Sequence, residues 1–116
     1  MQYMCLIYAS ENLEPAPGTP EFAALIEAYG AFSEKVEGDG KFVAGNALQP
    51  VATATTVSVR AGTTETIDGP FAETKEQLGG YYILDCKDLD EALAYAAMIP
   101  SAKMGRVEVR PVMVFD

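Results

Sequence analysis

Two short runs of almost uninterrupted apolar residues constrain the fold of this chain most, namely residues 3–9 and 80–86. Each run has the length of one β-strand, and apolar side chains at successive positions point to both faces of a sheet. Both faces of a sheet built from these strands must therefore be covered. The chain has 116 residues, so we expect a single domain over residues 1–116.

An amphipathic helix is predicted to follow the first strand and a polar loop over residues 10–18. Thr19-Pro20-Glu21 gives a hydroxyl N-cap, a proline at the first helical position and an acid in the first turn. Apolar residues then recur at steps of three and four, as Phe22, Leu25, Ile26, Tyr29, Phe32 and Val36. Gly38 and Gly40 are expected to end the helix.

A second helix is predicted after the strand over residues 80–86. Asp88 and Glu91 have capping-box spacing, and Pro100 marks the end of the helix. Its inner stripe is expected to contain mostly small residues, Leu89, Ala92, Leu93, Ala96 and Ala97. Small residues on this face favour close packing on a sheet.

Four further segments are predicted as strands. Residues 42–48 form one, residues 54–60 and 63–67 form a hairpin around Ala61-Gly62, and residues 106–110 alternate cleanly, with an apolar edge continuing to 115. Without the hairpin, the order of elements is βαββαβ, so we expect an α+β, ferredoxin-like antiparallel sheet with an inserted hairpin. Two helices cover only one face of such a sheet, and we therefore infer a homodimer in which two sheets pack face to face.

Composition excludes several classes of partner. The net charge is −9, from 17 acids and 8 bases, which argues against nucleic acids and anionic membranes. The first residues have no cationic signal-peptide region and their apolar run is too short to span a bilayer, so we expect a cytoplasmic protein. Cys5 and Cys86 lie in strand-like runs and are interpreted as buried free thiols. There is no histidine and no metal-ligand or phosphate-loop spacing, so we expect neither a metal site nor a cofactor.

The segment Asp68-Gly69-Pro70-Phe71 is the leading candidate for chemistry. Asp68 is interpreted either as a general base at the mouth of a cleft or as an acceptor that pins its own turn. Thr74 and Gln77 have capping-box spacing, which predicts one helical turn ending at the glycines 79–80. Lys75 at that turn is a candidate to hold a carboxylate or other small anion, the alternative being a plain solvated turn.

Tyrosines and an arginine complete the candidate set. Tyr8, Tyr29 and Tyr81 are expected in or beside the core, either as packing residues or as the walls of a cleft. Arg110 shares a strand face with Arg106 and Glu108, which favours an ion pair or, alternatively, a clamp for a carboxylate.

The segments 3–8, 28–32, 48–50, 68–82 and 107–111, and above all the run that begins Asp-Gly-Pro-Phe, resemble the DGPF-domain proteins, a branch of the YCII-related family. The resemblance implies a dimeric α+β barrel in which the 54–67 hairpin is an insertion of this branch. The wider superfamily includes isomerase-like, monooxygenase-like and dehydrochlorinase-like enzymes with a cleft between sheet and helices. YCII proteins have been proposed to use a histidine–aspartate pair, and this chain has no histidine. Many DGPF-domain proteins are encoded beside extracytoplasmic-function sigma factors.

Three hypotheses for the function follow from these features. The first is a cofactor-free small-molecule enzyme that catalyses isomerisation or elimination, with Asp68 as the base, the three tyrosines shaping the cleft, and Lys75 or Arg110 holding an acidic group. The second is a non-catalytic ligand-binding or regulatory module that associates with a sigma factor through its acidic surface. The third is structural oligomerisation, which leaves the 68–80 segment without a role.

Overall fold

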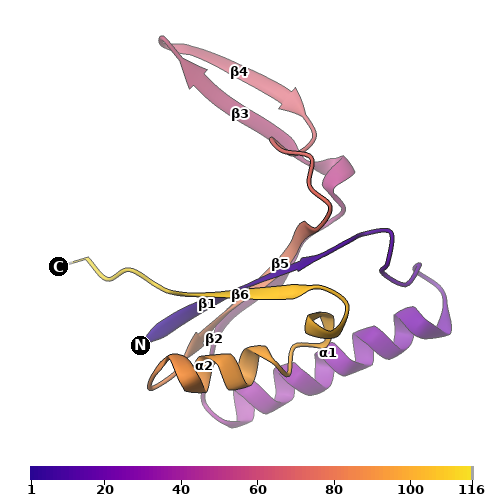
Figure 1. The fold of residues 1–116 in the computed structure, drawn as a ribbon, viewed down its shortest axis with the longest axis vertical. Helices are drawn as coiled ribbons and strands as arrows, with labels where there is room; N and C mark the ends of the chain where they lie inside the picture. The colour runs from indigo at the N-terminus through magenta and orange to yellow at the C-terminus, as the bar shows by residue number, and fades with distance from the viewer. Residues whose placement is uncertain (116) are drawn as a thin grey trace.

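The computed structural model describes residues 1–115, which form a four-stranded sheet, two α-helices on one of its faces and a separate hairpin (Figure 1). The elements in chain order are β1 (Gln2–Ala9), α1 (Pro20–Gly38), β2 (Phe42–Ala47), the short 3-10 helix η1 (Val51–Thr53), β3 (Thr55–Arg60), β4 (Thr63–Asp68), β5 (Gln77–Asp85), α2 (Leu89–Ala96), the 3-10 helix η2 (Pro100–Lys103) and β6 (Arg106–Pro111). The sheet has the order β2-β5-β1-β6, and all neighbouring strands are antiparallel. The predicted ferredoxin-like arrangement with an inserted hairpin is confirmed. Within residues 1–115, the helices are too short or too polar to cross a bilayer.

The core lies between the sheet and the two helices. Alternate residues of β1 are buried on this side, and they meet Leu84 and Cys86 from the β5 end and the helical residues Phe32, Val36, Ala92 and Ala96. Cys5 and Cys86 are free and buried, as predicted. Burial, and then the nearby Cys86, raise the pKa of the Cys5 thiol to about 11.

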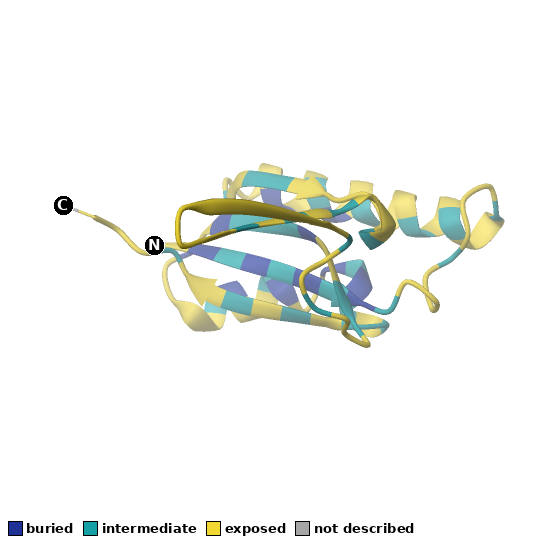
Figure 2. Ribbon diagram, turned by 90° about the horizontal axis from the view of Figure 1, so that it is seen from above, coloured by how far each residue is buried: buried dark blue, intermediate teal, exposed yellow. Residues whose placement is uncertain are grey.

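The opposite face of the sheet has no layer over it in this chain. Met4, Leu6 and Tyr8 alternate with the buried residues of β1 and are only half-buried, as are Tyr81 and Ile83 beside them (Figure 2). Arg106 and Arg110 border this surface and pair with Glu76 and Glu108. Arg106 thus forms an ion pair with another element, as interpreted, whereas Arg110 pairs within its own strand. The surface of half-buried apolar residues is called the open face below.

Both predicted helix starts are confirmed. Thr19 caps α1, its Oγ1 accepting a hydrogen bond of 3.2 Å from the Phe22 N–H. Asp88 caps α2, its Oδ1 accepting one of 2.9 Å from the Glu91 N–H. Helix α2 ends at Ala96, short of the predicted limit at Pro100.

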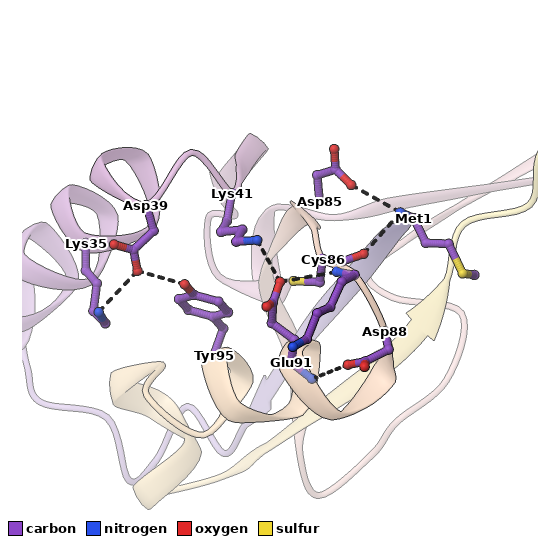
Figure 3. Close-up of polar contacts among 10 residues, drawn as sticks. Met1, Lys35, Asp39, Lys41, Asp85, Cys86, Asp88, Glu91 and Tyr95 are labelled. Atoms are coloured by element: carbon purple, nitrogen blue, oxygen red, sulfur yellow. Dashed lines mark hydrogen bonds and ion pairs between the residues drawn. The ribbon is translucent and has the colours of Figure 1, made fainter.

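A network of polar side chains fastens the C-terminal end of α1 to α2 and β2 (Figure 3). The Tyr95 hydroxyl donates a hydrogen bond of 2.7 Å to Asp39, which Lys35 also contacts at 3.2 Å. Lys41 Nζ lies 2.7 Å from Glu91 Oε1. These contacts, together with the burial of Phe32 and Val36, hold this end of α1 close to the sheet; the buried residues of α1 are all in this half.

The hairpin β3–β4, called the arm below, projects away from the sheet (Figure 1). Its two-residue turn has positive φ at both central positions, 50° at Ala61 and 79° at Gly62, as in the turns that suit the twist of a hairpin. Val57, Val59 and Ile67 are 62%, 58% and 63% exposed. The arm therefore buries little of its own apolar surface.

The segment between the arm and β5 differs from the prediction. Residues 74–77 form no helical turn: Gln77 is the first residue of β5, where it pairs with Ala9 of β1. The cross-strand ladder with β1 satisfies the main chain here, which overrides the local capping-box pattern. Gly79 and Gly80 lie inside the strand, and Gly79 is the extra residue of a β-bulge opposite β1. Residues 112–115 lie beyond the last strand and do not extend it as an edge.

Candidate functional site: a cavity beneath helix α1

A cavity of about 450 Å³ lies between α1 and the half of the sheet formed by β2 and β5. Its helical wall runs along most of α1: Phe22, Leu25 and Ile26 contribute apolar side chains near the start, and Tyr29, Ser33 and Glu37 contribute polar ones further along. Ile26 belongs to the predicted core stripe, yet it is 55% exposed, because the N-terminal half of α1 does not close onto the sheet. Most of the wall is apolar.

Glycines in the strands give the cavity its floor. A Cβ on Gly45 would lie 2.8 Å from Tyr82 Cδ1, so the absence of a side chain there lets the Tyr82 ring lie against β2. That ring meets Phe32 edge-on at 5.0 Å and Phe42 at 6.3 Å between centroids. The aromatic wall is therefore fixed by packing on both sides.

Two pairs of hydroxyl groups line the otherwise apolar space. The Tyr29 hydroxyl and Ser101 Oγ form a hydrogen bond of 2.5 Å, and Ser33 Oγ and the Tyr82 hydroxyl form one of 3.2 Å. Burial raises the pKa of Tyr29, outweighing the hydrogen bonds from Ser101 that lower it. Tyr29 is consequently a neutral phenol at physiological pH and can donate a hydrogen bond.

Two carboxylates, Glu14 and Glu37, also line the cavity, whereas no lysine or arginine does in the described part of the chain. Burial and then the charge of Glu11 raise the pKa of Glu14. The loop that carries Glu14 is anchored through Glu11, whose Oε2 accepts a hydrogen bond of 2.9 Å from the Val51 N–H. The charged side chains that line the site are therefore both acidic.

The structure brings only two of the predicted site residues to this cavity. Tyr29 contributes its phenol. Tyr81 also lines the cavity. Its side chain leaves β5 on the opposite face from that of Tyr82, and its hydroxyl accepts a hydrogen bond of 2.8 Å from Asn46. Tyr8 and Arg110 lie on the open face.

Asp68 and Lys75 lie outside the cavity. Asp68 is the last residue of β4, is exposed, and pairs with Thr55 in the arm. The turn after it is held by main-chain atoms, the Gly69 N–H donating a hydrogen bond of 2.7 Å to the Ala54 carbonyl. Lys75 is exposed in the segment before β5.

Sequence reasoning missed Glu14, Ser33, Glu37 and Ser101. Their signal is present for α1, where Tyr29, Ser33 and Glu37 follow at steps of four along the same side as the apolar stripe. Polar residues at that spacing on the core-facing side of a helix indicate a cavity between the helix and the sheet. Ser101 gives no such signal, because its partner Tyr29 is 72 positions away in the chain.

Comparison with solved structures finds 5-chloro-2-hydroxyhydroquinone dehydrochlorinase (TftG) of Burkholderia phenoliruptrix AC1100, solved in complex with 2,5-dihydroxybenzoquinone, at 16% identity and a TM-score of 0.49 over 97% of this chain and 94% of that one. A curated relative, the uncharacterized protein R00369 of Rhizobium meliloti strain 1021, is 38% identical over 117 residues, which cover 99% of this chain and 94% of the relative. The profile of the YCII-related domain matches residues 1–116. The match spans the whole chain and confirms the resemblance seen in its motifs, so the protein belongs to the YCII-related family.

Proposed function

We propose that the protein is a cofactor-free, isomerase- or lyase-like enzyme that binds a small organic molecule in the cavity beneath α1. The observation that carries the proposal is a cavity of about 450 Å³ with mostly apolar walls, lined by the neutral phenol of Tyr29 and, at its exposed rim, by Glu14, whose pKa is raised by partial burial. Its volume falls in the range of about 300–1,000 Å³ that is usual for ligand sites. A second cavity, of about 500 Å³, lies beside Tyr8, Glu76 and Arg106 on the open face, but it is more open to solvent.

Proton transfer is the chemistry that these groups suit. The chain has no histidine, so a carboxylate is the natural proton acceptor. We assign that role to Glu14 and assign Tyr29 as the donor to an oxygen that gains negative charge. Glu14 would remove a proton from carbon, and the electron pair would move toward that oxygen. Return of the proton at another carbon completes an isomerisation, and departure of a leaving group completes an elimination.

The test begins with a metabolite library screened by ligand-observed NMR, followed by turnover of each hit in D2O. Glu14→Gln is expected to lower turnover by about 10²–10⁴-fold while binding persists. Glu27→Gln removes the same charge from the far side of α1 and is the control. Equal turnover by the Glu14→Gln variant and the wild-type protein would refute the assignment of Glu14, and a library with no cavity hit would refute the proposal.

The role of Asp68 as the base stays a prediction of its own. Asp68 is exposed at the end of β4 and does not line the cavity beneath α1. Asp68→Asn in the same turnover assay tests this role. Unchanged turnover would remove Asp68 from the catalytic set and leave Glu14 untouched.

A ligand that binds in this cavity without being converted would make the protein a regulatory module instead. The net charge of −9 is the observation that favours such a partnership, because an acidic surface suits a basic partner. Association with an extracytoplasmic-function sigma factor stays a prediction, tested by pull-down with the purified factor. A tight hit with no turnover, together with a captured sigma factor, would favour this function over the enzyme.

We also propose a homodimer through the open face, because half-buried Met4, Leu6 and Ile83 would otherwise contact water. Light scattering tests it: Leu6→Lys is expected to give monomers, and Leu13→Lys, in an exposed loop, to leave the dimer intact. A wild-type monomer at 10 to 100 micromolar, roughly the range in which a weak dimer would form, would refute the dimer.

The two free buried thiols suit a reducing compartment, so we propose a cytoplasmic location, which cell fractionation tests.

A further inference from the structure

Glu37 has no counter-charge although two lysines are close to it in the sequence. Lys35 Nζ lies 3.2 Å from Asp39, and Lys41 Nζ lies 2.7 Å from Glu91 (Figure 3). Within residues 1–115, the carboxylate of Glu37 makes neither an ion pair nor a hydrogen bond. Glu37 is exposed and lies at the rim of the cavity, so its charge is available to a molecule that binds at this end.

Two aromatic rings, those of Phe42 and Tyr82, line the same cavity as Glu37. Ser33 lies one turn before Glu37 on α1, and its hydroxyl bonds to that of Tyr82. The Phe42 ring packs against the Tyr82 ring, and all four residues line the same space. The hydroxyls of Ser33 and Tyr82 bond to each other. The Glu37 carboxylate is therefore the group at this end that can accept a hydrogen bond from a ligand.

A carboxylate beside aromatic rings is the set of groups that recognises an organic cation. Ring faces attract an ammonium group electrostatically, and a nearby carboxylate adds a charge-assisted hydrogen bond. A carboxylate ligand would meet two like charges in this cavity, Glu14 and Glu37, and no basic side chain among the described residues. The net charge of −9 also favours the approach of a cationic ligand over an anionic one.

We propose that the molecule bound beneath α1 is an amine, with its ammonium group at Glu37, Phe42 and Tyr82 and its apolar body toward Leu25 and Tyr29. This inference rests on the proposed function, because it names the ligand class of the same cavity. It places the ammonium group about two helical turns from Tyr29, roughly 12 Å along α1. The charged group is thus held at one end of the cavity and the proton-transfer groups act at the other.

The test uses three probes of similar size and different charge: 2-phenylethylammonium, 2-phenylethanol and 3-phenylpropanoate. Dissociation constants at pH 7 come from calorimetry, and ring-proton shifts of Phe42 and Tyr82 locate each probe. The ammonium probe is expected to bind about tenfold more tightly than the alcohol, with the carboxylate weakest. Glu37→Gln is expected to abolish the tenfold preference, whereas Glu34→Gln, which removes the same charge from an exposed α1 position outside the cavity, is expected to keep it.

Equal binding of the amine and the alcohol at the cavity would overturn the amine inference and leave the proposed site intact. So would tightest binding by 3-phenylpropanoate, or equal effects of the Glu34 and Glu37 variants, which would mark the preference as a long-range charge effect. If none of the probes shifts the Phe42 and Tyr82 ring protons, both the inference and the proposed site fail. Urea denaturation of each variant shows that the fold is retained in every comparison.

Discussion

Gly79 and Gly80 are adjacent in β5, and the structure predicts opposite effects of alanine at the two positions. A Cβ on Gly80 would lie 2.8 Å from the Asn46 carbonyl oxygen and 3.3 Å from Ala47 Cα. Both atoms belong to the main chain of β2, so β2 has to move by several tenths of an ångström. A Cβ on Gly79 would meet only the Ile7 carbonyl, at 4.0 Å, which is an ordinary contact.

The size of each effect follows from these distances. Overpacking against main chain costs about 1–3 kcal/mol, and we expect about 2 kcal/mol for Gly80→Ala. Gly79 does not have positive φ, so alanine fits its backbone and restricts the unfolded chain, with a gain of about 0.4–1 kcal/mol. The two variants should then differ by about 2.5 kcal/mol, or roughly 10 °C in Tm at about 4 °C per kcal/mol.

Urea denaturation followed by circular dichroism measures this difference, at one protein concentration because dimerisation would shift the midpoint. The urea dependence of the unfolding free energy should be unchanged. Gly105→Ala is included as the variant expected to lose the most stability, since its Cβ would overlap the Tyr8 carbonyl oxygen. Equal losses for the Gly79 and Gly80 variants, or a neutral Gly80→Ala, would refute the reasoning from close contact.

Three further predictions concern charge, thiol reactivity and the arm. The hydrogen bond from Lys41 lowers the pKa of Glu91, so the stabilisation that Glu91 gives the fold is complete above the ordinary pKa of 4.5 and is lost as the pH falls through the lowered value. Below pH 4.5 the Tm of the wild type should therefore fall more steeply than the Tm of Glu91→Gln. Parallel curves of Tm against pH would contradict this. Because the pKa of Cys5 is about 11, Ellman's reagent at pH 8 should react with it only as the protein unfolds, and fast reaction of the native thiol would show that the site is open. Ala61→Asn should relieve about 1 kcal/mol of strain at φ 50° and slow amide exchange at Glu65, which pairs with Ser58, about fivefold; unchanged exchange would place the strain elsewhere.

The sequence predicted those parts of the fold that depend on neighbouring residues. Thr19 and Asp88 both cap helices, because a side-chain acceptor three residues before a free N–H satisfies it locally. The hairpin turn at Ala61-Gly62 and the apolar alternation of β1 are likewise local. The capping-box pattern at Thr74 and Gln77 was misleading, because pairing of Gln77 with Ala9 of β1 satisfies the same groups in a strand.

The position and size of the cavity could not be predicted from these patterns, although the polar residues at steps of four on α1 are a signal that a space lies there. The stripe on α1 is continuous from Phe22 to Val36, and nothing in its spacing indicates that the first half stands away from the sheet. That separation depends on where η2 and Tyr82 lie, which are determined by contacts between residues far apart in the chain. Tyr29 was identified as a candidate because a buried phenol needs a partner, but its partner Ser101 could be found only in three dimensions.

The two ends of the arm meet at its base, where Gly69 bonds to Ala54 and the Thr56 hydroxyl donates a hydrogen bond of 2.8 Å to the Gly69 carbonyl. A segment that leaves and rejoins a domain at one point can be lengthened, shortened or exchanged at small cost, since the entropy of closing a loop grows only slowly with its length. The main sheet and the cavity constrain one another through shared contacts, but the arm is free of that constraint. Evolution can therefore change the length and sequence of the arm without altering the cavity beneath α1.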